Sequence, residues 1–345
     1  MGGVRYILRR VSLAVFVILG VLLITFAVSR IIPGDPARLY LGARASQQAV
    51  EQIRNELGLN DPLPKQFLRY VVDSTQGNFG YSFRTKRLIL DDLKKRLPAT
   101  MELVVLALIF SVLVGVPVGV LAAAHFGGTL DRFVRVISVL GVSMPAFWLA
   151  LLLQLMFFLW LDLLPLGGRL GQTISLLHPI ETITGFYLID AAITGNWVAW
   201  RDAAWHAILP TAVLATFPIS LVIRMIRASM LEVLSETYVT AARAAGLGES
   251  EILFKLTLKN AVVPTLTILG LIFAFSITGA VLIETIFKWP GLGSYMLEAV
   301  LNDDVPVLFA VTLVVTLIYI AVNLIVDLVQ ASLDPRIRIG HRDNT

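Results

Sequence analysis

The stretch VPVLFAVTLVVTLIYIAVNLIVDLV, residues 305–329, decides the fold class of this chain. It carries a single charged side chain, Asp327, and exceeds the about 20 apolar residues that a helix needs to cross a bilayer. Comparable apolar segments lie at residues 11–29, 100–124, 137–164, 208–226 and 262–287. The sequence therefore predicts an all-α membrane protein with about six transmembrane helices.

The composition agrees with a chain that lies mostly in lipid. Of its 345 residues, 57% are hydrophobic and only 15% are charged, and the mean hydropathy is +0.80. Soluble domains carry charge on about a quarter of their residues. Cysteine is absent, which excludes a disulfide framework and thiolate metal sites. No stretch combines a basic face with base-stacking groups, so no nucleic acid partner is expected.

The N-terminal end has the charge pattern of a secretory signal but not its length. Arg5, Arg9 and Arg10 precede the first apolar run. That run exceeds the roughly 7–15 residues of a signal-peptide core, and no small-x-small cleavage site lies before Arg30. We expect an uncleaved first transmembrane helix.

The short loops indicate an orientation. Loop 288–304 holds one Lys against three acidic residues, whereas Lys and Arg gather in the loops on the other side. The positive-inside rule then places both termini in the cytoplasm. The expected organisation begins with a cytoplasmic N-terminus and helix 1 at residues 1–29, followed by an extracytoplasmic loop region at 30–98. The permease core with helices 2–6 follows at 99–329 and contains the cytoplasmic coupling loop 230–260. A cytoplasmic tail occupies residues 330–345.

The extracytoplasmic segments contain folded pieces. The spacing of apolar residues predicts a helix over 46–57, with Ser46 as its N-cap. The apolar clusters at 174–177 and 186–193 are too short to cross a membrane. Three tryptophans suit an interfacial belt, namely Trp197, Trp200 and Trp205.

Small residues, prolines and polar groups mark the predicted spans. Gly115 and Gly119 predict a close helix contact. We expect the helices to tolerate their prolines because neighbouring groups can satisfy the freed carbonyls; these are Pro117, Pro145, Pro210 and Pro218. Five polar residues could line a translocation path, although hydrogen bonding between helices is favoured for each: Gln154, Ser220, Ser276, Thr278 and Asn323.

Ionisable residues in the spans are interpreted as structural, and no catalytic or metal site is evident. Arg224 and Arg227 are interface anchors that could also gate the path, and Glu284 and Asp327 lie near helix ends. Neither a His-Glu-x-x-His nor a Gly-x-Ser-x-Gly motif occurs.

The most informative segment is the cytoplasmic stretch 232–260. It contains Thr240-Ala241-Ala242-Arg243-Ala244-Ala245-Gly246, a helical run of small residues that ends in a C-cap glycine. A helix with a face of small side chains can bind in a groove of another protein, because small side chains permit close backbone approach. An ordinary helical hairpin would explain the same residues equally well.

This segment resembles the EAA loop of ABC-importer permeases, whose pattern is Glu-Ala-Ala-x3-Gly-x9-Ile-x-Leu-Pro. Ala241, Ala242 and Gly246 match it, and Leu256 and Leu258 occupy the Ile and Leu positions. Thr240 replaces the Glu and Lys259 replaces the Pro. These departures resemble the dipeptide/oligopeptide/nickel branch of the family.

Further strings carry the resemblance along nearly the whole chain. In order, they are Pro33-Gly34-Asp35-Pro36, Leu57–Pro64, Gly77–Ser82, Leu97–Thr100, Ser143–Trp148, Leu164–Gly168, Phe287–Gly293 and Asp334–Arg338. With its long first outside loop, the chain is similar to the B-type subunit. The resemblance implies the type I ABC importer permease fold in a bacterial or archaeal inner membrane.

The resemblance also implies partners. The sequence has no Gly-x4-Gly-Lys-Ser/Thr phosphate loop, so we expect no enzyme activity and no cofactor on this chain. ATP and Mg would sit on two separate ATPase subunits. One of them would hold in a groove the coupling helix that contains Thr240, Ala241, Ala242 and Gly246. A homologous second permease and an extracytoplasmic substrate-binding protein would complete the importer.

Within the permease family that the chain resembles, peptides are the favoured cargo. A chelated nickel or other metal is the nearest alternative, and an ATP-independent channel is the alternative from another class. An intramembrane protease lacks support, because it would need a catalytic pair inside the helices.

Overall fold

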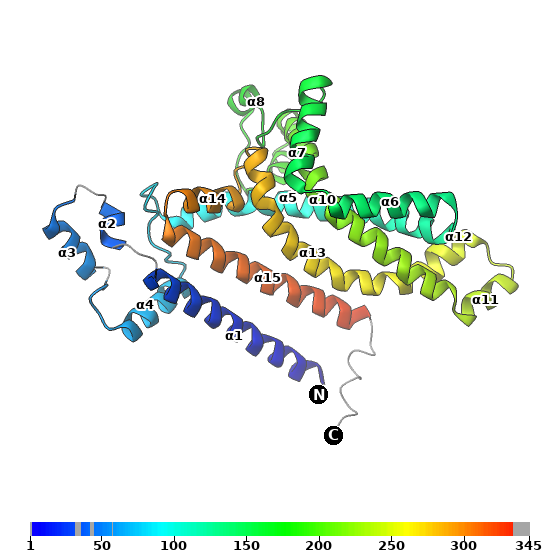
Figure 1. Cartoon of the computed structure of the whole chain (residues 1–345), viewed down its shortest axis with the longest axis horizontal. Helices are drawn as coiled ribbons and strands as arrows, with labels where there is room; N and C mark the ends of the chain where they lie inside the picture. Colours follow the sequence, from blue (N-terminus) through cyan, green and yellow to red (C-terminus); the bar gives the residue numbers. More distant parts are fainter. Residues whose placement is uncertain (1, 32–35, 42–44, 57, 334–345) are drawn as a thin grey trace. The chain divides into compact units, whose positions relative to one another are not determined.

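The computed structural model describes residues 2–31, 36–41, 45–56 and 58–333. Within these residues the chain is almost entirely helical (Figure 1). The α-helices are α1 (Gly2–Ile31), α2 (Pro36–Leu41), α3 (Gln47–Glu56), α4 (Leu63–Thr75), α5 (Ile89–Ala124), α6 (Thr129–Ser143), α7 (Ala146–Gln154), α8 (Gln172–Leu177), α9 (Tyr187–Ile193), α10 (Trp197–Leu234), α11 (Thr237–Ala244), α12 (Glu249–Glu251), α13 (Leu258–Ile286), α14 (Leu292–Leu301) and α15 (Val305–Leu333). Two π-helical segments, η1 (Leu155–Trp160) and η2 (Ile252–Thr257), continue α7 and α12.

The described helices fit the predicted membrane protein. Five of them, in α1, α5, α10, α13 and α15, are long and apolar enough to cross a membrane. The pair formed by α6 and the α7–η1 segment reaches that criterion jointly, which gives up to six spans. The predicted number of about six is therefore confirmed. The structure does not describe residues 33–35 or the tail beyond residue 333, and it does not describe the side chain of Asp327. The predictions for these residues therefore lie outside the described part of the chain.

The third predicted span, 137–164, is a bent pair of helices, and the expectation that its helix tolerates Pro145 is wrong. It bends by 102° between α6 and α7. Met144 is extended at φ −73° and ψ 128°, and Pro145 caps the start of α7 at φ −62° and ψ 125°. A proline clashes with an α-helical residue before it, so the chain leaves the helix here. By contrast, Pro117, Pro210 and Pro218 lie inside helices as expected.

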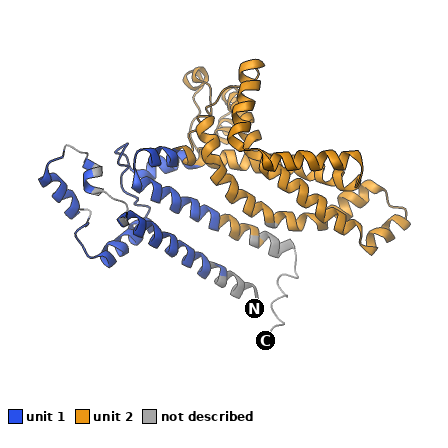
Figure 2. Ribbon diagram, viewed as in Figure 1, with its two compact units in different colours: residues 1–97, 295–320 blue, residues 98–294, 321–345 orange. Residues whose placement is uncertain are grey.

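The chain forms two compact units, which are coloured separately in Figure 2. Unit 1 comprises residues 1–97 and 295–320, and unit 2 comprises residues 98–294 and 321–345. In unit 2, α5 and α10 approach closely: a Cβ at Gly115 would lie 2.8 Å from Val222, and one at Gly119 would lie 2.9 Å from Ile226. The predicted close contact of these glycines is confirmed.

Unit 1 contains the helices of the predicted extracytoplasmic loop that follows α1, namely α2, α3 and α4. The predicted helix over 46–57 is confirmed as α3, and the Ser46 hydroxyl accepts a hydrogen bond from the Ala49 amide at 3.3 Å. Helix α4 packs on α1, where Thr25 Oγ1 lies 3.0 Å from the Tyr70 hydroxyl. The aromatic rings of Phe26 and Phe67 meet nearby, 5.4 Å apart.

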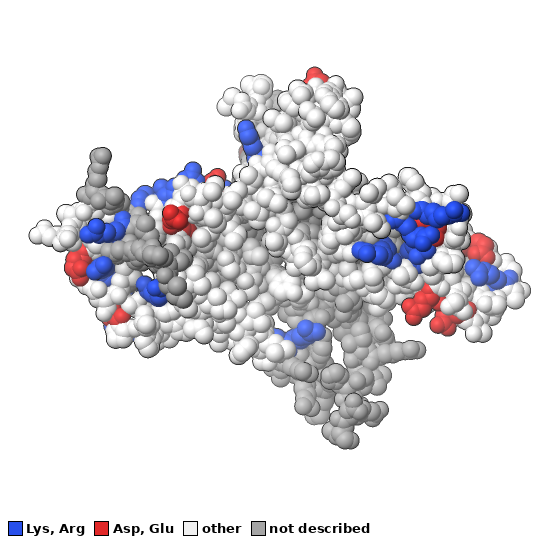
Figure 3. Space-filling model, in the orientation of Figure 1, with Lys and Arg blue, Asp and Glu red and all other residues white. Residues whose placement is uncertain are grey.

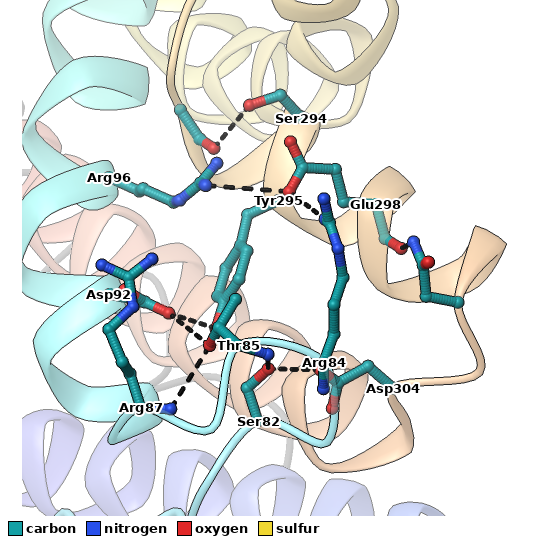
Figure 4. Close-up of polar contacts among 12 residues, drawn as sticks. Ser82, Arg84, Thr85, Arg87, Asp92, Arg96, Ser294, Tyr295, Glu298 and Asp304 are labelled. Carbon is teal, nitrogen blue, oxygen red and sulfur yellow. Dashed lines mark hydrogen bonds and ion pairs between the residues drawn. The ribbon is translucent and has the colours of Figure 1, made fainter. Parts of the chain in front are cut away.

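A short hairpin after α4 is fixed to the start of α15 in unit 1 (Figure 4). The Asp304 carboxylate, 2% exposed, accepts hydrogen bonds from Ser82 Oγ at 2.5 Å and from the Phe83 and Arg84 amides at 3.0 and 3.2 Å. Arg84 also pairs with Glu298 of α14 at 2.7 Å. The hairpin is thereby held by charge-assisted hydrogen bonds.

In unit 2 the stretch 165–196 folds as short pieces, and residues 197–205 already belong to the long helix α10. Helices α8 and α9 correspond to the two apolar clusters, and both are too short to span a membrane, as predicted. Asp190 of α9 fixes the preceding loop, because its buried carboxylate accepts from the Ile183, Thr184 and Gly185 amides at 3.1, 2.8 and 2.9 Å.

Candidate coupling surface

Helix α11 is a short, sharply bounded helix between α10 and α12. Its C-terminal end forms a Schellman motif. The Leu247 amide donates to the Ala242 carbonyl at 3.2 Å, and the Gly246 amide donates to the Arg243 carbonyl at 3.0 Å. Gly246 adopts φ +83°, a left-handed conformation that favours glycine. The predicted C-cap glycine is confirmed.

One face of α11 is buried in unit 2 and another is free. Val239 is fully buried, while Tyr238 and Arg243 flank it as exposed residues. The exposed side carries a stripe of small residues at helical spacing, which we call the small-residue stripe: Thr237, Thr240, Ala241 and Ala244. A flat, small face of this kind allows another backbone to approach closely.

The stripe is held in place by contacts to the segments that follow α11. The Tyr238 hydroxyl accepts from Asn260 Nδ2 of α13 at 2.9 Å. Arg243 donates to both carboxylate oxygens of Glu249, at 2.8 and 3.3 Å. This hydrogen bond lowers the pKa of the Glu249 carboxyl and raises the pKa of Arg243. The Tyr238–Asn260 hydrogen bond thus connects α11 to α13.

The four residues predicted to contact an ATPase fall on different parts of this surface. Thr240 and Ala241 lie on the stripe, whereas Ala242 is half-buried. Gly246 is exposed, and a Cβ added there would meet nothing within 4 Å. Sequence reasoning did not single out Ala244, although the spacing of three and four residues from Ala241 and Thr240 could have identified it.

The five candidate path residues are spread over four elements. Gln154 is buried and donates to the Leu166 and Ile286 carbonyls at 2.8 and 3.3 Å, which is a structural role. Ser220 is also buried and bonds within α10 to the Thr216 carbonyl at 2.9 Å.

The other three candidates are more varied. Ser276 is buried, and its hydroxyl has no hydrogen-bond partner in the described part of the chain. Thr278 is exposed on α13, and Asn323 is half-buried on α15. Among the described residues, no hydrogen bond joins any two of the five. A shared translocation path lined by these residues therefore stays a prediction.

A buried ion pair, missed from the sequence, lies in unit 2. Arg169 Nη2 lies 2.5 Å from Glu102 Oε2, and each side chain is 5% exposed. Arg169 also donates to the Gly185 carbonyl at 3.0 Å and stacks 3.7 Å from the centre of the Tyr187 ring. Glu102 accepts a second hydrogen bond from the Leu188 amide at 2.9 Å.

Beside this ion pair, two of the segments that carry the family resemblance contact each other, namely 97–100 and 287–293. Trp289 Nε1 donates to the Ala99 carbonyl at 2.8 Å. The Thr100 hydroxyl donates to Glu284 at 2.5 Å and accepts from the Leu292 amide at 2.7 Å. A Cβ at Gly291 would overlap Glu284 and Thr100, so only glycine fits there. The expected structural role of Glu284 is supported by these bonds.

A second buried charge pair joins α6 and α10. Arg227 Nε and Nη2 contact the Asp131 carboxylate at 2.5 and 2.9 Å, and Asp131 is fully buried. Arg227 thus joins two helices, whereas its predicted role as an anchor at the membrane interface or as a gate stays a prediction. In the described residues, no group of three or more His, Cys, Asp or Glu side chains could hold a metal ion.

Comparisons with known proteins agree with this arrangement. The family model for the binding-protein-dependent transport system inner membrane component matches residues 115–339, and the model for the N-terminal part of such membrane components matches residues 3–104. A probable D,D-dipeptide transport system permease protein of Escherichia coli is 45% identical over 94% of this chain and 95% of its own length. A di/tripeptide transport system permease protein of Pseudomonas aeruginosa is 41% identical over 96% of this chain and 98% of its own length.

A solved structure shares the fold. The MetNI methionine ABC transporter in an inward-facing conformation aligns with a TM-score of 0.51 and 16% identity, over 68% of this chain and 93% of that chain. The predicted importer-permease fold is therefore confirmed. The chain belongs to the family of binding-protein-dependent transport system inner membrane components, the permease subunits of ABC importers.

Proposed function

We propose that this permease moves di- and oligopeptides into the cytoplasm by alternating access, driven by ATP hydrolysis on separate subunits. The observation that carries the peptide cargo is the set of relatives, 40–45% identical over at least 94% of the chain, whose names specify dipeptide transport. Selection among peptides would rest largely with a substrate-binding protein outside, which delivers cargo to the permease.

The small-residue stripe of α11 is the proposed seat for an ATPase subunit. Two ATPase subunits would bind ATP and Mg, one of them on this chain and the other on a homologous second permease. Their closure would push on α11. Because Val239 is buried and Tyr238 is bonded to Asn260, the push would move the ends of α10 and α13 together. Such rigid-body rocking around a central path is how transporters alternate access.

Both termini are placed in the cytoplasm in this proposal. The supporting observation is the charge asymmetry of the short loops together with α11, which must face the ATPases inside the cell. Fusing a cytoplasm-dependent reporter to the C-terminus would give signal in intact cells, and a signal only from an extracytoplasmic reporter would reverse the orientation.

Uptake into proteoliposomes tests the proposal. They would contain this chain, its partner permease and the ATPases, with the substrate-binding protein outside and ATP inside. Labelled di- to pentapeptides would compete with chelated nickel. Peptide accumulation that stops without ATP supports the proposal. Nickel-only uptake would overturn the cargo, and ATP-independent flux would indicate a channel.

A further inference from the structure

A groove on unit 2 lies between α6 and α10, with a cavity of about 210 Å3. Its apolar wall is formed by Val134, Val139 and Ile223, and three arginines surround it: Arg135, Arg224 and Arg227. The cavity is smaller than the roughly 300–1,000 Å3 of pockets for drug-sized ligands. It therefore suits a small headgroup that continues into an apolar chain.

The three arginines differ in the hydrogen bonds and ion pairs that they make. Arg227 is committed to Asp131 through two hydrogen bonds. Arg135 is 3.7 Å from the same carboxylate, and its side chain is 55% exposed. Arg224 is exposed and makes no hydrogen bond or ion pair with any residue that the structure describes. One carboxylate against three guanidinium groups leaves the groove with two positive charges.

The outer surface of these helices shows the same charge. Figure 3 shows Lys and Arg side chains gathered over the region where Figure 1 draws α6 and α10, with acidic side chains directly beside them. Between them, α6 exposes large apolar side chains, for example Phe133 at 65% and Val139 at 63%. An anion with an apolar tail complements this combination, whereas a free polar anion would leave the apolar wall uncovered.

The depth of the arginines also fits a lipid headgroup. Arg135 lies six residues after the start of α6 at Thr129, which is about 9 Å along the axis. Arg224 lies ten residues before the end of α10 at Leu234, or about 15 Å. Long basic side chains near the ends of membrane helices extend to the phosphate level.

We propose that the α6–α10 groove binds the phosphate of an anionic phospholipid, with Arg224 and Arg135 as its ligands and the apolar wall along its acyl chain. Guanidinium groups pair with phosphate oxygens through bidentate hydrogen bonds. A zwitterionic lipid brings an ammonium group toward the same arginines and is disfavoured. This site is separate from the coupling surface and does not depend on the cargo.

Native mass spectrometry of the purified complex tests the proposal. Phosphatidylglycerol and phosphatidylcholine with the same acyl chains would be titrated onto the wild type, Arg224→Gln, and the Arg135→Gln/Arg224→Gln double variant. We expect the wild type to prefer phosphatidylglycerol and each substitution to weaken its binding about five-fold. Arg132→Gln is the matched control, because Arg132 is an exposed arginine of α6 that does not line the cavity. It should bind as the wild type does.

Arg224→Lys keeps the charge but loses the bidentate guanidinium fork, so it should bind phosphatidylglycerol more tightly than Arg224→Gln and less tightly than the wild type. The melting temperature should stay unchanged in all variants, because the Asp131–Arg227 pair is left intact. An unchanged lipid preference in the double variant would overturn the proposal. Two other results would as well: inorganic phosphate binding as tightly as phosphatidylglycerol, which indicates a free-anion site, or loss of the partner permease at unchanged lipid affinity, which indicates a protein interface.

Discussion

Removing one charge of the buried Glu102–Arg169 pair should destabilise the protein strongly. Glu102→Gln leaves the Arg169 guanidinium, 5% exposed, without its counter-ion. Breaking one side of a buried ion pair costs about 3–5 kcal/mol. Arg169→Met leaves the Glu102 carboxylate with the Leu188 amide as its donor, and we expect a cost in the same range.

The double variant Glu102→Met/Arg169→Met separates burial of a lone charge from loss of packing. It leaves no buried charge, but the Leu188 amide and the Gly185 carbonyl lose their partners. Unsatisfied buried groups cost about 1–3 kcal/mol. The double variant should therefore lose less stability than the sum of the single variants, with a coupling energy of about 1–3 kcal/mol.

Denaturant unfolding of the purified chain in detergent would measure these free energies. Glu249→Gln is the control, because it breaks an exposed ion pair with Arg243 and should leave the stability unchanged. If Glu102→Gln and Glu249→Gln behaved alike, the pair would not be desolvated and the reasoning would be refuted. Additive single and double effects would refute the coupling.

Three further predictions concern glycines and an acidic residue. Gly291→Ala should lower the free energy of unfolding by about 1–3 kcal/mol, because the added Cβ overlaps Glu284. An unchanged denaturant titration would show that the site can relax and would contradict this prediction. Gly246→Ala should cost about 1–2 kcal/mol through its φ of +83° alone, and a neutral result would show that the turn is not left-handed. Burial would raise the pKa of Asp190, but hydrogen bonds from Thr184 and its neighbours lower this pKa overall. The ionised carboxylate therefore stabilises the folded protein above about pH 4, and this stabilisation is lost as the pH falls through the lowered pKa. Amide exchange at Thr184 should then accelerate in acid, relative to an Asp190→Asn variant that shows no such step; equal pH profiles would contradict this.

Much of the architecture could be predicted from the sequence, since long apolar runs leave a helix few alternatives in lipid. The exception is the third span, where composition alone could not distinguish a kinked helix from a bend of 102°. Pro145 stands at the start of α7 and Pro117 inside α5, yet both lie in comparably apolar sequence.

The coupling segment was located from the sequence because small residues and a C-cap glycine are local signals. Which face of α11 is exposed depends on the contacts of Val239 and Tyr238, which are tertiary. The Glu102–Arg169 pair joins residues far apart in sequence, and neither is part of a motif that would identify the other. Such pairs become visible only when the helices are placed.

The most direct test of the account compares ATP hydrolysis with peptide uptake in an Ala244→Trp variant, in proteoliposomes with all partner subunits. Ala244 is a better site than Gly246, where a bulky residue such as Trp would also strain the left-handed turn. Ala228→Trp, at an exposed alanine of α10, is the matched control. We predict that Ala244→Trp reaches the membrane but loses uptake, while Ala228→Trp retains it. Normal coupled uptake by Ala244→Trp would contradict the assignment of α11 as the coupling helix.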